Sequence, residues 1–418
     1  MSERLYLREY EKAQLPPAKL RDLTDAAAQL HTELRPTIRQ FRRDARGASL
    51  GNVVGSVALP NGDVAVIEPK IPTDDWTTSV VHLLTDETRL AVTGSQHSRP
   101  SERKNDLTAA IALEYARRLD SALRKDGPIL QYIQLHEVTR KWRGRLDVTS
   151  WTRTSMIDPT RFPMTRDELA ILNDFSRAMS VVAGFLAKSA AGQNTASRLR
   201  KLQTEVIPGV AVPTFVNPAV ARRRLPTQWG SYAPAWDIAA PILRNQFIVG
   251  NPGRSIGLEV AVEPWRLLET LLERALSVVA NADNDVHLEP KTKHTILTPQ
   301  YDESVELSKS FPRAVAPDGL LRQSDGQVMA TFEAKYATGP KRDHVYQALA
   351  TAAALESPHA FLIYPWDSPA QHYAVTGFYG RPRLLTTVGV NLFGYRRGTS
   401  DQSLATTLRN LIALHTHD

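Results

Sequence analysis

Strand-like and helix-like hydrophobic patterns alternate between residues 316 and 365. Apolar and polar positions alternate over Val328–Tyr336 with the period of two that is typical of a strand. A helical pattern covers Asp343–Leu355, and the apolar run Ala360–Pro365 predicts a buried strand. Turn-forming residues before the first of these segments indicate a preceding strand joined to it; they are Gly319, Ser324, Asp325 and Gly326. The order strand, strand, helix, strand is that of an α/β fold.

A shorter combination of strands and helix occupies the beginning of the chain. Residues 5–7 and 53–71 have strand patterns, the second with a turn at Pro60–Asp63. Residues 17–43, which lie between these strands, have a largely helical pattern. We therefore expect a small α+β domain here.

The middle of the chain is mainly helical and ends in a proline-rich stretch. Helical patterns cover residues 105–124 and 167–186, with a strand-like segment at 130–148 between them. Within the proline-rich stretch 208–241, five prolines predict one long irregular connection: Pro213, Pro218, Pro226, Pro234 and Pro241. The predicted domains are an N-terminal α+β domain at 1–100, a mainly helical middle region at 101–240, and a C-terminal domain at 241–418. The N-terminal domain is expected to dock a partner or contact DNA.

Composition predicts a soluble protein without cysteine chemistry. Of the 418 residues, 42% are apolar and 23% are charged, and no apolar run approaches the roughly 18 residues that a membrane-spanning helix needs. The complete absence of cysteine excludes disulfides, thiolate catalysis and cysteine zinc sites. The charged N-terminus is not followed by an apolar signal segment, so we expect a cytoplasmic protein.

An excess of basic residues favours polyanionic partners such as DNA. The formal net charge is +7, and much of the excess is clustered. Two clusters are candidates for phosphate contact: Arg140, Lys141, Arg143 and Arg145, and then Arg222, Arg223 and Arg224. The alternative is that both are solvated surfaces without a ligand.

One pair of motifs is typical of a metal-dependent nuclease. Pro317-Asp318 is followed fifteen residues later by Glu333-Ala334-Lys335, and the strand period places Glu333 and Lys335 on one face. Carboxylate and carbonyl oxygens are the ligands that Mg²⁺ prefers, which makes Asp318, Glu333 and the Ala334 carbonyl a candidate site. Lys335 would orient the attacking water and offset phosphate charge. The alternative is a cross-strand charge pair beside an ordinary turn.

The sequence lacks the motifs of nucleotide hydrolysis and of histidine-based metal sites. The segment Gly250–Ser255 resembles a phosphate-binding loop but has no Gly-Lys-Ser/Thr, so no nucleotide hydrolysis is expected from this chain. None of the eleven histidines stands in a His-Glu-x-x-His or similar ligand spacing.

Four motifs together resemble the McrC family, the nuclease subunit of modification-dependent restriction systems within the PD-(D/E)xK superfamily. They are Pro317-Asp318, Glu333-Ala334-Lys335, Tyr346-Gln347 and Leu362-Ile363-Tyr364-Pro365. Weaker similarities follow the family's order upstream, at Leu5–Tyr10, Ile67–Pro72, Trp142–Asp147 and Asp167–Asn173. The resemblance implies that residues 241–418 form a restriction-endonuclease-like domain with a mixed central sheet flanked by helices.

The resemblance also implies two further site residues. The superfamily usually adds an acidic residue from a helix before the catalytic strands, and in Pro264–Glu273 the candidate is Glu269, with Glu273 as the fallback. The alternative for both is a solvated carboxylate on an amphipathic helix. Gln347 is expected to position water or phosphate.

The implied function is Mg²⁺-dependent cleavage of modified or foreign DNA, with Mn²⁺ as a substitute for Mg²⁺. McrC-like proteins act with a separate McrB-like AAA+ hexamer, a GTPase or ATPase, which this chain would stimulate through residues 1–240. Double-strand cleavage would require two copies of the complex to meet at the DNA. Two alternatives remain open: a free-standing nuclease in DNA repair or phage defence, and a non-catalytic DNA-binding adaptor.

Overall fold

The computed structural model describes residues 4–34, 41–44, 47–71, 73–95, 106–189, 192–245, 257–297, 314–376 and 384–413. The chain divides into two compact units. Unit 1 consists of residues 1–2 and 85–260, and unit 2 of residues 3–84 and 261–418. Within the described ranges, no helix is both long and apolar enough to cross a membrane.

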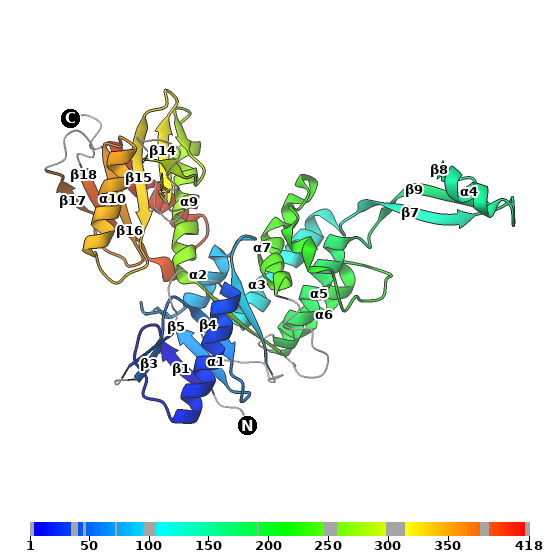
Figure 1. Ribbon diagram of the computed structural model, residues 1–418, viewed down its shortest axis with the longest axis horizontal. Helices are drawn as coiled ribbons and strands as arrows, with labels where there is room; N and C mark the ends of the chain where they lie inside the picture. Colours follow the sequence, from blue (N-terminus) through cyan, green and yellow to red (C-terminus); the bar gives the residue numbers. More distant parts are fainter. Residues whose placement is uncertain are drawn as a thin grey trace, which may run out of the picture. The chain divides into compact units, whose positions relative to one another are not determined.

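The N-terminal part of unit 2 is built on a small mixed sheet (Figure 1). Strand β1 (Arg4–Arg8) lies parallel to β5 (Val64–Glu68), which pairs antiparallel with β4 (Val54–Ala58). On the other side of β4, Ala261 and Val262 of β10 (Gly257–Val262) continue the sheet. Strand β1 covers the strand expected at residues 5–7, and β4 and β5 are those expected on either side of the turn at Pro60–Asp63, so these predictions are confirmed. Strand β10 was not predicted.

Helix α1 (Pro17–Leu34) and the β2–β3 hairpin complete this part. The helix buries one apolar stripe: Leu23, Ala26, Ala27, Leu30 and Leu34. The predicted helix over residues 17–43 is too long, because β2 (Phe41–Asp44) is a strand paired with β3 (Gly47–Leu50). The cross-strand hydrogen bonds of that hairpin outweigh the local helical pattern.

The C-terminal part of unit 2 is a six-stranded mixed sheet in the order β11-β14-β15-β16-β18-β17. The two central pairings are β14 (Gly319–Gln323) antiparallel to β15 (Val328–Ala334), and β15 parallel to β16 (His359–Tyr364). The other strands are β11 (Val286–Leu288), β17 (Gln371–Ala374) and β18 (Leu384–Gly389). The predicted α/β order of strand, strand, helix, strand is confirmed.

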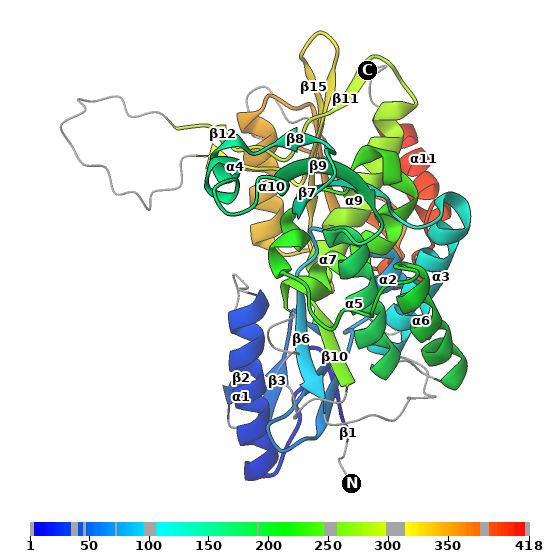
Figure 2. The same ribbon diagram turned by 90° about the vertical axis from the view of Figure 1, so that its right-hand side faces the viewer.

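Helices cover both faces of this sheet (Figures 1 and 2). On one face, α10 (Arg342–Ala354) packs Ala348 and Ala352 against Ala360, Leu362 and Tyr364 of β16. On the other face lie α9 (Pro264–Asn281) and α11 (Thr399–Ala413), and α9 contacts β11, β14 and β15. The core is therefore a three-layer arrangement of helices around a sheet.

One glycine allows α9 to approach the sheet closely. A Cβ atom at Gly319, the first residue of β14, would lie 2.3 Å from Cδ1 of Leu276, a fully buried side chain of α9. That distance is far below van der Waals contact, so any larger residue would push helix and strand apart. Because Gly319 follows Asp318 directly, the close approach also brings α9 next to Asp318.

Unit 1 has a helical body. Helices α3 (Leu107–Asp126), α5 (Asp174–Ser189), α6 (Gln193–Glu205) and α7 (Ala233–Arg244) pack on one another. The unit also contains strand β6 (Leu90–Ser95) and two short 3-10 helices, Pro218–Arg222 and Thr227–Tyr232. The predicted irregular stretch therefore ends before residue 233, and Pro234 at the start of α7 occupies a position where a missing N–H is tolerated.

A β-ribbon arm extends from the helical body of unit 1 (Figure 1). Strands β7 (Gln131–Thr139) and β9 (Phe162–Ala170) pair antiparallel over their full length. The outer part of the arm carries β8 (Arg145–Leu146) and the short helix α4 (Val148–Thr154). Large apolar side chains on the arm are exposed: Tyr132, Val138, Trp142, Val148, Met156, Ile157 and Leu169.

The arm corrects the prediction of a helix over residues 167–186. Asp167, Glu168 and Leu169 belong to β9, and the helix α5 begins only at Asp174. Asn173 separates the two elements, since its Oδ1 accepts the Ser176 N–H at 3.0 Å and its Nδ2 donates to the Ile129 carbonyl at 2.9 Å. Pairing with β7 overrides the local helical pattern.

Candidate active site

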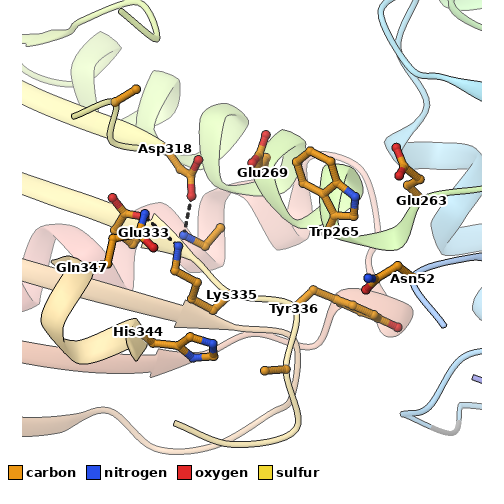
Figure 3. A pocket seen from close by; sticks show the side chains of 13 residues that line it. Asn52, Glu263, Trp265, Glu269, Asp318, Glu333, Lys335, Tyr336, His344 and Gln347 are labelled. Carbon is orange, nitrogen blue, oxygen red and sulfur yellow. Dashed lines mark hydrogen bonds and ion pairs between the residues drawn. The ribbon is translucent and has the colours of Figure 1, made fainter. Parts of the chain in front are cut away.

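A cavity of about 310 Å³ opens in unit 2 at the carboxyl end of β15 (Figure 3). Its lining includes the predicted residues Asp318, Glu333, Ala334, Lys335, Gln347 and Glu269. The remaining lining residues are Asn52, Glu263, Trp265, Ala316, Tyr336, Ala337 and His344. Sequence segments that are far apart thus converge on one concave surface.

The hairpin of β14 and β15 places Asp318 beside Ala334. The Asp318 N–H donates to the Phe332 carbonyl at 3.0 Å, which extends the pairing of the two strands by one residue. The Ala334 N–H in turn donates to Asp318 Oδ2 at 2.9 Å. Asp318 and Glu333 are fifteen positions apart in the sequence, but the tight turn between β14 and β15 brings them together. The Asp318 carboxylate is therefore fixed against the strand that carries Glu333.

Glu333 is buried and is held by three side chains. Its Oε2 accepts from Lys335 Nζ at 2.8 Å and from Gln347 Nε2 at 2.9 Å. Its Oε1 accepts from Thr351 Oγ1 at 3.4 Å. Burial raises the pKa of Glu333, the Lys335 ammonium opposes that rise, and the Asp318 carboxylate adds to it. Glu333 and Lys335 therefore lie on one face of β15 and its continuation, as the strand period predicts. Gln347 and Thr351 of α10 contact Glu333 on that face.

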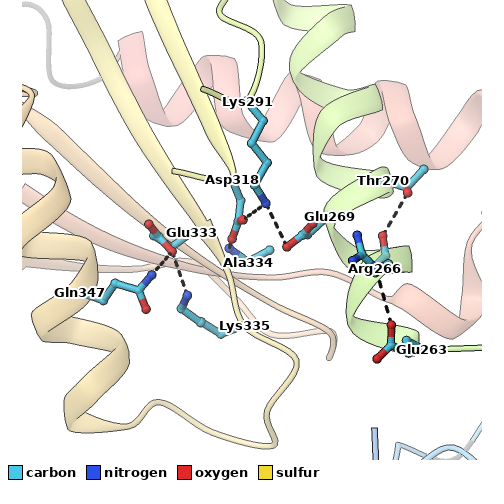
Figure 4. A network of polar contacts seen from close by, with 10 residues as sticks. All are labelled: Glu263, Arg266, Glu269, Thr270, Lys291, Asp318, Glu333, Ala334, Lys335 and Gln347. Atoms are coloured by element: carbon cyan, nitrogen blue, oxygen red, sulfur yellow. Dashed lines mark hydrogen bonds and ion pairs between the residues drawn. The ribbon is translucent and has the colours of Figure 1, made fainter. Parts of the chain in front are cut away.

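Glu269 reaches the site from α9, and a lysine lies between it and Asp318 (Figure 4). Lys291 Nζ is 2.6 Å from Asp318 Oδ1 and 3.2 Å from Glu269 Oε1. Burial and the nearby Asp318 charge raise the pKa of Glu269 to about 7. Burial alone would lower the pKa of Lys291, but the charges and hydrogen bonds of Asp318 and Glu269 raise it instead. The fallback Glu273 is exposed and does not line the cavity.

Lys291 contacts two of the predicted site carboxylates, although no sequence motif predicted it. It lies on the connection between β11 and β12 (His294–Thr295), outside every motif. A single lysine in a connection has no periodicity or spacing that marks it. Only the fold brings its ammonium to the carboxylates.

The donor set is suited to a hard divalent cation. It combines the carboxylates of Asp318, Glu333 and Glu269 with the backbone carbonyl of Ala334, all oxygen ligands. Among the described residues, no three carboxylates or histidines are already arranged to hold a metal ion. The ammonium of Lys291 lies between two of these carboxylates, so the site already attracts positive charge.

The two basic clusters lie elsewhere, in unit 1. Arg140, Lys141, Arg143 and Arg145 are exposed on the β-ribbon arm. Arg222, Arg223 and Arg224 are exposed at the end of the first 3-10 helix, where Arg223 pairs with Asp174 at 2.7 Å. Contact of either cluster with DNA stays a prediction.

The fold is similar to that of proteins of known structure. A chain of the refined half-complex from the tetradecameric assembly of Thermococcus gammatolerans McrB AAA+ hexamers with bound McrC matches with a TM-score of 0.59 and 14% identity. That match covers 98% of this chain and 100% of the other. A second match, to the cryo-EM structure of the Thermococcus gammatolerans McrBC complex, has a TM-score of 0.44 and 15% identity over 66% of this chain and 88% of that one.

Sequence comparison gives the family. No curated protein matches the chain. Residues 48–365, well over half of the chain, match the family described as McrBC 5-methylcytosine restriction system component. The matched range includes the cavity residues Asp318, Glu333 and Lys335. The resemblance stated from the motifs is thereby confirmed, and the chain belongs to the McrBC family of 5-methylcytosine restriction system components.

Proposed function

We propose that this chain is the McrC-like nuclease subunit of a restriction system, a Mg²⁺-dependent endodeoxyribonuclease with a PD-(D/E)xK domain at its C-terminus. The observation that supports this most is the convergence of Asp318, Glu333 and Lys335 in one cavity, joined by Glu269 and Gln347. Carboxylate and carbonyl oxygens that can hold a divalent cation, beside a lysine and an amide, are suited to metal-dependent phosphodiester hydrolysis. The substrate is modified or foreign DNA.

Each residue has a distinct role in this proposal. Asp318, Glu333, the Ala334 carbonyl and Glu269 would hold the divalent cation, which supplies Lewis acidity and lowers the pKa of bound water. The Lys335 ammonium, 2.8 Å from Glu333, orients the attacking water and offsets charge that develops on the phosphate. Gln347 holds Glu333 in place through its amide at 2.9 Å. Mn²⁺ is expected to replace Mg²⁺ because it takes the same oxygen ligands.

The partner is proposed to be a McrB-like AAA+ hexamer that hydrolyses GTP or ATP and is stimulated by this chain. Family membership supports such a partner, and the arm of unit 1 offers a surface for it. Met156 and Ile157 on the arm are 88% and 89% exposed, which leaves large apolar side chains in water. Exposed apolar side chains that are gathered on one element are typical of a protein interface.

A plasmid cleavage assay tests the nuclease directly. The full chain would be incubated with supercoiled DNA and Mg²⁺ or Mn²⁺, with and without a McrB-like partner and its nucleotide. We expect nicked and linear DNA from the wild-type protein and none from Lys335→Ala, which should still bind Mn²⁺ in calorimetry. Equal cleavage by Lys335→Ala would reject the site, and cleavage without a partner would favour a free-standing nuclease.

Lys291 provides a second, independent test of the cation site. Its ammonium must leave Asp318 and Glu269 before a divalent cation can bind there, so it competes with the cation. We expect Lys291→Met to bind Mn²⁺ roughly tenfold more tightly than wild type, a change of about 1.4 kcal/mol. Titration calorimetry measures this without any cleavage. The matched control is Lys293→Met, an exposed lysine on the same connection, whose affinity should equal that of wild type. Unchanged or weaker binding by Lys291→Met would contradict the location of the site.

A further inference from the structure

A buried polar cluster lies at the edge of the N-terminal sheet of unit 2. Glu9 directly follows β1, and Lys70 lies two residues beyond β5. Because β1 and β5 are parallel, their carboxyl ends meet at the same edge of the sheet. The Glu9 N–H donates to the Glu68 carbonyl at 2.9 Å, and the Lys70 N–H donates to Glu9 Oε2 at 3.3 Å. The Glu9 side chain is only 2% exposed.

This cluster holds Tyr336, the residue that follows Lys335. The Tyr336 hydroxyl donates to Glu9 Oε2 at 2.5 Å. Lys70 Nζ donates to the Tyr336 carbonyl at 2.8 Å and lies 3.7 Å from the centroid of its ring. Backbone and side chain of one residue are therefore held by two residues that are 327 and 266 positions away in the sequence.

Burial makes this arrangement costly. Desolvation raises the pKa of Glu9 to about 7 and lowers the pKa of Lys70 to about 8. Within the described part of the chain, Glu9 Oε1 has no hydrogen-bond partner. Buried charged groups rarely add stability over apolar residues of similar size, which points to a role other than stability for Glu9 and Lys70.

The geometry of the chain at Lys335 indicates that role. The Lys335 N–H donates to the Ile363 carbonyl of β16 at 2.8 Å, beyond the last residue of β15. The chain then turns, with the Ala337 N–H donating to the Lys335 carbonyl at 2.8 Å. Lys335 is thus fixed by the sheet on its amino side, and Tyr336 fixes it on its carboxyl side.

We propose that Glu9 and Lys70 are positioning residues for the nuclease, because they hold Tyr336 and thereby set the direction in which Lys335 presents its ammonium to the cavity. This inference rests on the proposed function of the cavity. It gives the N-terminal α+β segment a part in the active site, in addition to the docking or DNA contact expected from the sequence. Asn52, from the same segment, lines the cavity and accepts the Tyr10 hydroxyl at 2.5 Å.

Three variants distinguish positioning from simple packing. Tyr336→Phe removes the hydroxyl and keeps the ring, which packs edge-on against Phe393. Glu9→Ala removes the acceptor, whereas Glu9→Gln keeps an oxygen that can accept from Tyr336. The matched control is Glu11→Gln, an exposed carboxylate just after the same strand.

The full chain would be assayed for DNA cleavage with the partner that wild type requires. We expect Tyr336→Phe and Glu9→Ala to lower kcat by roughly 10- to 100-fold, because a displacement of about 1 Å has effects of that size. The KM for DNA should stay within about twofold of wild type, since no DNA contact is removed. Glu9→Gln should restore most of kcat. Wild-type kcat in Tyr336→Phe, or a fall in kcat that Glu9→Gln does not restore, would overturn the proposal.

Amide hydrogen exchange tests the same proposal without any cleavage. The amides of residues 335–337 should exchange faster in Tyr336→Phe and Glu9→Ala than in wild type or Glu11→Gln. Unchanged exchange would overturn the positioning role, even if the nuclease is active. If wild type does not cleave DNA under any condition, the proposed function fails, and faster exchange would still support the hold of Glu9 on Tyr336.

Discussion

Asp318→Ala is expected to abolish metal-dependent cleavage of DNA while the protein stays folded. Asp318 is the carboxylate that touches both the Ala334 amide and Lys291, so its loss removes a proposed cation ligand from the middle of the site. A loss of at least about 1000-fold in rate corresponds to roughly 4 kcal/mol of transition-state stabilisation. Calorimetry should find Mn²⁺ binding lost together with cleavage.

The stability of Asp318→Ala distinguishes a functional carboxylate from a structural one. The Asp318 charge contributes to the raised pKa values of both Glu269 and Glu333, so its removal relieves repulsion among buried carboxylates. We therefore expect an unchanged or higher melting temperature. Asp325→Ala, in the exposed turn between β14 and β15, is the matched control and should cleave DNA like wild type. Cleavage by Asp318→Ala would contradict the assignment.

The second large effect is expected on the arm of unit 1. Met156→Asp and Ile157→Asp each replace an apolar side chain that faces water with a carboxylate. Because both side chains are exposed, the fold of the arm should not change. If the arm is buried in a McrB-like partner, each substitution should weaken association by roughly 30-fold or more, the scale of an interface residue worth about 2 kcal/mol. Stimulation of nucleotide hydrolysis and partner-dependent cleavage should fall together.

A matched control lies in the helical body of the same unit. Leu113 on α3 is 56% exposed, and Leu113→Asp adds the same charge outside the arm. It should associate with the partner like wild type, as judged by size-exclusion chromatography and nucleotide hydrolysis. If Leu113→Asp were as defective as the arm variants, or if the arm variants associated normally, the arm would not be the docking surface.

The site residues that a sequence pattern alone predicted are those that pairing between two neighbouring strands brings together. Asp318, Glu333 and Lys335 lie on one hairpin and its continuation, so a strand period of two and one turn are enough to place them together. Glu269 was predicted only through the family resemblance, and its position depends on the close approach of α9 at Gly319. The roles of all these residues stay predictions.

The contacts missed from the sequence are those between distant segments. Lys291 reaches the cavity from a connection, and Glu9 and Lys70 reach Tyr336 from the opposite end of the chain. No pattern in a single sequence encodes such pairings. The error at residues 167–170 has a related cause, because the pairing of β9 with β7 lies 30 or more residues away and outweighs local helix preference.

The division of the chain has a consequence for how the protein is made. Unit 2 combines residues 3–84 with residues 261–418, so its two parts leave the ribosome before and after residues 85–260 of unit 1. Ser79 of α2 (Trp76–Leu83), for example, donates to the Phe393 carbonyl at 2.6 Å, and that acceptor lies 314 positions later in the chain. Unit 1 can fold during translation, whereas β15 and the N-terminal segment that holds Tyr336 can join only after residues 85–260 have been synthesised. A nascent chain that ends before β15 would thus lack the assembled cavity.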